Sequence, residues 1–186
     1  MGYVGHKLLA AIFTFLQGCG HIVKGQGQLF HFFRIILCQS DPGIQITVTE
    51  KDATVRDFGR GIPLGSVVRA VSVLNTGGKY DSKGYKKSVG LNGVGLKAVN
   101  ATSTNFEVRS YREGVVRIAK FEKGILVSAT TENTNDENGT YISFTPDNSL
   151  YRNYEYRDAY IETLLRNYTY LNTGLAIMLN GKRIVS

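Results

Sequence analysis

The chain has 186 residues, of which 42% are hydrophobic and 20% are charged, and its formal net charge is +7. This composition is typical of one soluble globular domain with a buried core, and the length excludes a large multidomain enzyme. No apolar run reaches the roughly 18 to 20 residues that cross a bilayer, and two cysteines cannot build a disulfide framework. We therefore expect a cytoplasmic protein that makes no membrane contact.

The first 43 residues differ in composition from the rest of the chain. Two apolar stretches, 8–16 and 29–38, flank a segment rich in Gly and Gln, and Asp41 is the only acidic residue there. The first stretch ends shortly before Cys19, which is also the pattern of a secretory or lipoprotein signal. We favour a buried or amphipathic helix, with secretion or lipid anchoring as the alternative.

From residue 44 onward, hydrophobic periodicity and turn residues predict short strands and helices. Apolar and polar residues alternate over 44–49 as in a half-buried strand, and Asn180-Gly181 is typical of a tight hairpin turn. In chain order we expect strands at 44–49 and 53–57, helices at 64–74 and 93–101, strands at 105–111, 114–121, 124–130 and 139–145, a helix at 157–170, and strands at 174–179 and 183–185. This order predicts an α+β fold, a two-layer sandwich whose mixed, mostly antiparallel sheet carries helices on one face.

The excess positive charge is concentrated in residues 51–100, which hold nine Lys and Arg against three Asp. A loop expected over 75–90 carries four of these Lys, and glycines 90, 93 and 95 follow where the loop becomes a helix. Free backbone N–H groups at such a boundary bind anions, and Lys79 can add a charge for a terminal phosphate. The pattern favours a phosphate-bearing ligand over a nucleic-acid track, with a solvated basic face as the alternative.

A second block, from Asp57 to Gly65, reads Asp-Phe-Gly-Arg-Gly-Ile-Pro-Leu-Gly. Its carboxylate ends a strand, and its glycines allow the backbone to approach a flat ligand closely. A carboxylate that only accepts hydrogen bonds suits the exocyclic amine of adenine, which donates them. Pro63 is expected at the first position of the next helix, where a missing N–H costs nothing. Alone, this block is equally compatible with an ordinary Asp-Gly turn.

Together, the two blocks resemble the ATP-binding core of the GHKL superfamily, and most closely the B subunits of type IIA DNA topoisomerases, gyrase B and topoisomerase IV B. The resemblance continues through Asn138-Gly139-Thr140 and 171–174, so that residues 44–186 are expected to form the GHKL core and residues 1–43 do not match it. It implies an ATP-binding domain of an enzyme that couples ATP binding and hydrolysis to DNA strand passage. It also implies Mg²⁺ as a cofactor, with a second B subunit, an A subunit and DNA as partners.

The resemblance places an adenine pocket around the end of the strand over 53–57. There, Asp57 would hold the adenine amine, and Thr140 would hold a water that it shares with Asp57. The wall of the pocket would consist of Arg60, Gly61, Ile62 and Pro63. Taken alone, Thr140 is also an ordinary strand residue.

The resemblance assigns the triphosphate to the basic, glycine-rich region. A lid that folds over the nucleotide would contain Gly78, Lys79 and Tyr85. Backbone N–H groups of one continuous run would bind the β- and γ-phosphates: Gly90, Leu91, Asn92, Gly93, Val94 and Gly95. Lys97 lies one helical turn further on, and we expect its side chain on the surface.

The chain departs from the family pattern in its N-terminal part. Relatives carry a Glu that acts as the general base and, one helical turn later, an Asn that binds Mg²⁺, whereas residues 1–49 contain no Glu. Because general-base catalysis contributes about 10²- to 10⁴-fold, we expect nucleotide binding with poor hydrolysis, and we assign no catalytic residue and no metal ligand.

Two interpretations of this departure stay open. We favour a truncated or frame-shifted coding region for residues 1–43, which makes the chain a monomeric fragment of a B subunit. The alternative is a genuine divergent segment. For the function, the alternative to a B-subunit domain is a non-catalytic module that binds adenine nucleotides and has no connection to DNA topology.

Overall fold

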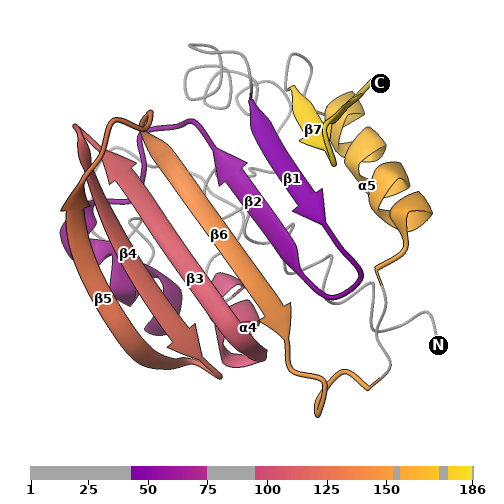
Figure 1. Ribbon diagram of the computed structural model, residues 1–186. Helices are drawn as coiled ribbons and strands as arrows, with labels where there is room; N and C mark the ends of the chain where they lie inside the picture. Colours follow the sequence, from indigo (N-terminus) through magenta and orange to yellow (C-terminus); the bar gives the residue numbers. More distant parts are fainter. Residues whose placement is uncertain (1–42, 75–94, 153–155, 172–175, 186) are drawn as a thin grey trace.

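The computed structural model describes residues 43–74, 95–152, 156–171 and 176–185 (Figure 1). The strands in these segments are β1 (Ile44–Val48), β2 (Ala53–Asp57), β3 (Ser103–Arg112), β4 (Val115–Glu122), β5 (Ile125–Asn133), β6 (Gly139–Pro146), β7 (Ile177–Leu179) and β8 (Lys182–Ile184). The helices are the short 3-10 helix η1 (Leu64–Ser66) and the α-helices α3 (Val67–Ser72), α4 (Gly95–Ala101) and α5 (Asp158–Leu171).

All described strands belong to one sheet, in the order β5-β4-β3-β6-β2-β1-β7-β8. Neighbouring strands are antiparallel except β1 and β7, which pair in parallel. Along β1, Ile44, Ile46 and Val48 are buried while the residues between them are exposed, as the alternation of side chains along a strand requires. The expected mixed, mostly antiparallel sheet of an α+β fold is confirmed.

The described helices cover one face of this sheet. In Figure 1, α4 lies behind β3 and β6, and α5 lies beside β7 at the other end of the sheet. Val71 of α3, Val99 of α4 and Leu165 of α5 join one hydrophobic cluster with the central strands, in which Val108 and Ile142 are buried. A single core between sheet and helices therefore holds the two layers together.

The first helix after the strand β2 is shorter than expected. We predicted a helix over 64–74 with Pro63 at its first position, but Pro63 precedes the 3-10 helix with an extended ψ of 126°. The α-helix ends at Ser72. The Val73 N–H still donates to the Arg69 carbonyl, but Val73 itself is extended (ψ 127°), so the helix does not continue. Pro63 therefore leads the chain into the helical segment instead of starting the helix.

The C-terminal hairpin forms at the expected turn. Asn180 and Gly181 both have positive φ, +47° and +79°, as a tight two-residue hairpin turn requires. The Asn180 side chain also accepts a hydrogen bond from the Val48 N–H at 2.8 Å, so the turn is attached to the end of β1.

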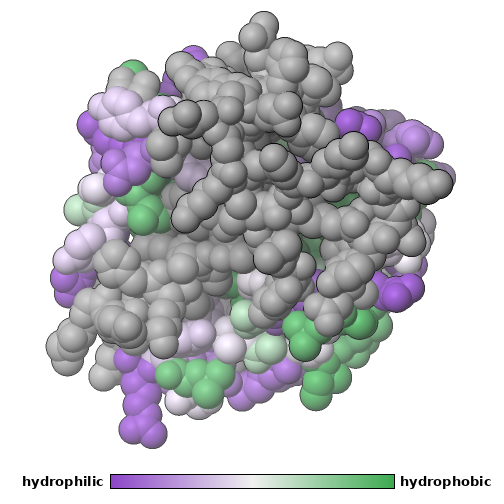
Figure 2. Space-filling view, turned by 180° about the vertical axis from the view of Figure 1, so that it is seen from behind, coloured by the Kyte–Doolittle hydropathy of each residue, from purple (hydrophilic) through white to green (hydrophobic). Residues whose placement is uncertain are grey.

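The strand β5 forms one edge of the described sheet and exposes apolar side chains where it begins. Ile125, Leu126 and Val127 are 73%, 44% and 65% exposed. Seen from behind, the described surface shows apolar groups gathered near its lower edge (Figure 2). Within the described segments, no helix combines the length and apolar character that a membrane span needs.

Candidate functional site

The site is built around a carboxylate at the end of β2. Asp57 is the last residue of β2 and lies directly opposite Thr140 of β6 in the antiparallel register. Its Oδ1 accepts a hydrogen bond from the Gly59 N–H at 2.9 Å, and the Thr140 hydroxyl and N–H also donate to the carboxylate. The structure therefore brings Asp57 and Thr140 together at the end of β2.

Burial raises the pKa of Asp57, and the hydrogen bonds from Gly59 and Thr140 only partly oppose this shift. Thr140 is itself 3% exposed. A carboxylate that is held by fixed donors at a poorly solvated strand end is a strong, directed acceptor for a further N–H donor.

Two glycines bring backbone segments close together next to Asp57. Gly139 has a φ of +146°, and a Cβ at this position would collide with the carbonyl group of Asp57. Gly61 has a φ of +70°, and a Cβ there would lie 2.6 Å from the carbonyl oxygen of Tyr111. Only glycine permits both the conformation and the close approach at these two positions.

The predicted adenine wall divides into two parts. Gly61 and Ile62 are partly buried, and the Ser110 hydroxyl donates to the Ile62 carbonyl at 2.6 Å, which attaches this loop to β3. Ile62 also packs against the hydrophobic core. Arg60 and Pro63 are exposed. The structure therefore brings Asp57, Gly61, Ile62 and Thr140 to the same end of the sheet.

Most of the predicted phosphate site lies outside the described residues. This applies to Gly78, Lys79, Tyr85, Gly90, Leu91, Asn92, Gly93 and Val94. Only Gly95 is described, as the first residue of α4. The roles of the lid and of the glycine run stay predictions, as does the assignment of residues 1–42, which are also outside the described residues.

The expectation for Lys97 was wrong, because its side chain is buried and only 6% exposed. It lies in the first turn of α4, three residues before Asn100, which is also buried and whose Nδ2 donates to the Val71 carbonyl at 3.0 Å. Burial lowers the pKa of the Lys97 ammonium.

Sequence reasoning also missed two arginines next to the site. Arg112 ends β3, and its Cγ would lie 3.0 Å from a Cβ at Gly61. Arg56 precedes Asp57 on β2, and its Nη2 donates to the Glu137 carbonyl at 2.6 Å, beside the start of β6. Both positions depend on strand register between distant segments, which no local spacing reveals.

Comparisons with known proteins place this geometry in a family. No family model matches the chain. Among curated relatives, the B subunit of DNA topoisomerase 4 from Borreliella burgdorferi is 46% identical over 129 residues, which are 69% of this chain and 22% of the relative. The B subunit of DNA gyrase from Halalkalibacterium halodurans is 38% identical over 153 residues, with 75% of this chain and 24% of the relative covered. The chain thus spans less than a quarter of the length of these relatives.

A solved structure supports the same assignment at the level of the fold. The 43K ATPase domain of Thermus thermophilus gyrase B, solved in complex with an aminocoumarin, matches 99% of this chain and 45% of its own length, with a TM-score of 0.64 and 20% sequence identity. With the sequence relatives, this likeness confirms the predicted family. The chain belongs to the B subunits of type IIA DNA topoisomerases and has the fold of their GHKL ATPase domain.

Proposed function

We propose that the chain binds ATP, as the nucleotide-binding part of a type IIA topoisomerase B subunit. The observation that carries the proposal is the Asp57 carboxylate, fixed by the Gly59 N–H and by Thr140 at the end of β2. Adenine presents an amine donor where guanine presents a carbonyl acceptor, so a fixed carboxylate accepts a hydrogen bond from one base and repels the other. This chemistry supports adenine selectivity.

Lys97 supports a polyanionic tail on the ligand. Lys97 is 6% exposed and stands in the first turn of α4, where the helix dipole favours an anion. A phosphate bound at this end would interact favourably with the Lys97 charge and with the dipole. We therefore propose that Lys97 contributes to phosphate binding together with the predicted glycine run from Gly90 to Gly95.

We further propose that hydrolysis by this chain is close to background. Residues 1–49 contain no Glu that could act as the general base of the relatives. Within the segments that the structure describes, no three His, Cys, Asp or Glu side chains are grouped as metal ligands. The absence of a Glu also keeps a purely nucleotide-binding role as the second candidate. DNA strand passage with an A subunit and a partner B subunit is proposed only by analogy with the longer relatives.

Isothermal titration calorimetry tests the site with the β,γ-imido analogues of ATP and GTP on the whole chain. We expect measurable binding of the ATP analogue, and a loss of at least about tenfold in its affinity in Asp57→Asn, because an amide cannot replace a charged acceptor. Asp158→Asn, at an exposed position of α5, is the matched control and should bind like the wild type. Undetectable binding by the wild type, or unchanged affinity in Asp57→Asn, would overturn the proposal.

A further inference from the structure

Arg56 occupies a confined position on the opposite face of the strand that carries Asp57. Adjacent strand residues point to opposite faces of a sheet, so Arg56 lies on the face away from the helices. Its guanidinium carbon is 4.1 Å from the ring centroid of Tyr111 and 4.9 Å from that of Phe58. Both distances fall within the range of cation–π interactions, so two aromatic rings fix the guanidinium plane.

The same guanidinium is attached to the segment that enters β6. Its Nη2 donates to the Glu137 carbonyl at 2.6 Å. Its Nη1 is buried without a hydrogen-bond partner among the described residues, and a Cβ at Gly139 would lie 2.9 Å from it. The chain from Glu137 to Gly139 therefore passes closely over the arginine, in space that only glycine leaves open.

Through these contacts, Arg56 is connected to Asp57 and Thr140, the two central residues of the site. Gly139 lies against the Asp57 carbonyl and opposite Tyr111, and the next residue, Thr140, pairs with Asp57. A shift of the Glu137–Gly139 backbone therefore moves Thr140 relative to the Asp57 carboxylate. The guanidinium contacts Tyr111 of β3, Phe58 directly after β2 and the Glu137 carbonyl shortly before β6.

We propose that Arg56 is a positioning residue for base recognition: stacked on Phe58 and Tyr111, it fixes the Glu137–Gly139 segment so that Thr140 and Asp57 meet with the geometry that selects adenine. This inference rests on the proposed function. It assigns Arg56 no contact with the nucleotide, since the residue acts from the far face of the sheet.

The test compares ligands that share the triphosphate and differ in the base. Calorimetry on Arg56→Met measures affinity for the imido analogues of ATP and GTP and for inorganic tripolyphosphate. We expect the ATP analogue to bind about tenfold more weakly, which lowers its preference over the GTP analogue by the same factor, while tripolyphosphate affinity stays within about twofold. A general loss of structure would weaken all three ligands together.

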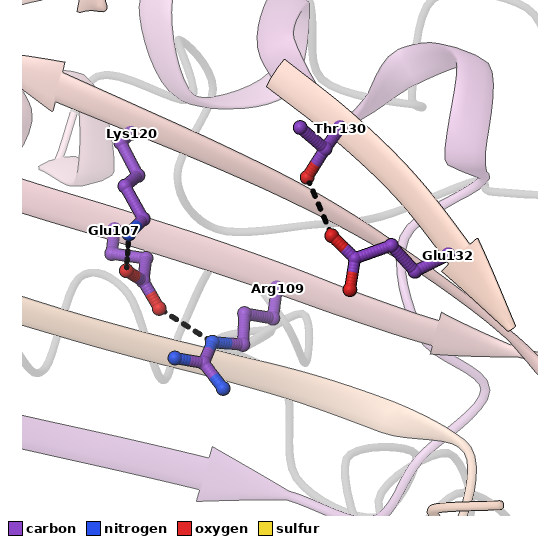
Figure 3. Close-up of polar contacts among 5 residues, drawn as sticks. All are labelled: Glu107, Arg109, Lys120, Thr130 and Glu132. Carbon is purple, nitrogen blue, oxygen red and sulfur yellow. Dashed lines mark hydrogen bonds and ion pairs between the residues drawn. The ribbon is translucent and has the colours of Figure 1, made fainter. Parts of the chain in front are cut away.

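Three further variants sharpen the test. Arg56→Lys keeps the charge and should recover part of the selectivity. Phe58→Leu is a milder change that still tests the inference if Arg56→Met folds poorly. It should shift selectivity in the same direction as Arg56→Met, by a smaller factor. Arg109→Met is the matched control, because Arg109 also lies on the outer face of the sheet (Figure 3). Its guanidinium carbon is 5.1 Å from the ring centroid of Tyr141. The control should leave selectivity unchanged.

The outcomes separate this inference from the function on which it rests. If the wild type binds the ATP analogue, Asp57→Asn weakens that binding and Arg56→Met keeps the wild-type selectivity, the positioning role is wrong while the proposed function stands. An equal loss for tripolyphosphate in Arg56→Met also overturns the positioning role. If the wild type binds no ATP analogue, both the function and this inference fall.

Discussion

Two groups of charged residues on the same sheet differ mainly in their access to water. Asp57 is largely withdrawn from solvent at the end of β2, where backbone and hydroxyl groups donate to it. Glu107, Arg109 and Lys120 lie on the outer face of β3 and β4, where Glu107 contacts Arg109 at 2.5 Å and Lys120 at 3.4 Å (Figure 3). The outer group is held by ion pairs, whereas the hydrogen-bond donors to Asp57 are uncharged.

The difference shows that burial and fixed donors, more than the number of charges, give a carboxylate its chemistry. The side chains of Arg109 and Lys120 are 41% and 57% exposed, so water and salt screen their attraction to Glu107. Asp57 has fewer charged neighbours. Its pKa is set mainly by burial, which disfavours the charged carboxylate. Four predictions test this contrast.

The largest effect is expected from the backbone that surrounds Asp57. Gly139→Ala should lower the free energy of unfolding by about 3 kcal/mol, because the new methyl group collides with the Asp57 carbonyl and φ is +146°. Urea denaturation followed by circular dichroism measures this change. Gly65→Ala is the control, since a Cβ there meets nothing within 4 Å, and it should stay within about 0.5 kcal/mol of the wild type. An equal loss of unfolding free energy at the two positions would contradict a steric cause.

A buried cation should matter more for ligand binding than an exposed one. Lys97→Met should weaken the ATP analogue, the GTP analogue and tripolyphosphate alike, by about tenfold, because it removes a charge proposed to face phosphate. Lys120→Met removes an exposed charge of the outer group and should leave all three affinities unchanged. Calorimetry at one fixed salt concentration makes the comparison. Base-selective loss in Lys97→Met would contradict a phosphate role.

Acidification should move stability and binding in opposite directions. Burial raises the pKa of Asp57 in the folded chain, so the folded state takes up this proton at higher pH than the unfolded state. The Asp57 contribution to stability therefore increases as pH falls from about 7 towards the ordinary carboxyl pKa of about 4, and it is lost as pH rises again.

Over the same pH range, affinity for the ATP analogue should fall, because a protonated carboxyl is a weaker acceptor. Thermal melts and calorimetry at each pH, with the Asp57→Asn values subtracted, isolate this residue from other carboxylates. A difference in stability that decreases on acidification would show that the pKa of Asp57 is lowered instead of raised.

Local pattern predicted most of the fold, whereas the pairing of Asp57 with Thr140 was expected only from the family resemblance. The bounds of β2 were predicted to the residue, because apolar and polar residues alternate over 53–56 and Gly59 follows shortly after Asp57. The strand β5 extends to Asn133 instead of 130, since pairing with β4 continues beyond the last apolar residue. Gly124, which we placed in this strand, is a turn residue with φ +81°.

The contacts that local pattern missed all depend on long-range register. Arg112 meets Gly61, and Arg56 meets Glu137, across separations of about fifty and eighty residues. A one-residue slip between paired strands would turn every side chain of the shifted strand to the other face, and the local sequence pattern does not fix this register. Lys97 was missed for a different reason: a lysine is assigned to the surface by default, and only the packing of α4 shows that this one is buried.

The smallest effect is expected in the outer charged group. Glu107→Gln should change the free energy of unfolding by about 0.5 kcal/mol, because exposed ion pairs gain little over hydration, and 1 M NaCl should reduce the difference further. Denaturation at low and high salt measures both values. A cost above about 2 kcal/mol that survives in high salt would mean that Glu107 is effectively desolvated. Exposure would then no longer distinguish the outer group from Asp57, and the difference between them would have to come from the fixed donors of Gly59 and Thr140 alone.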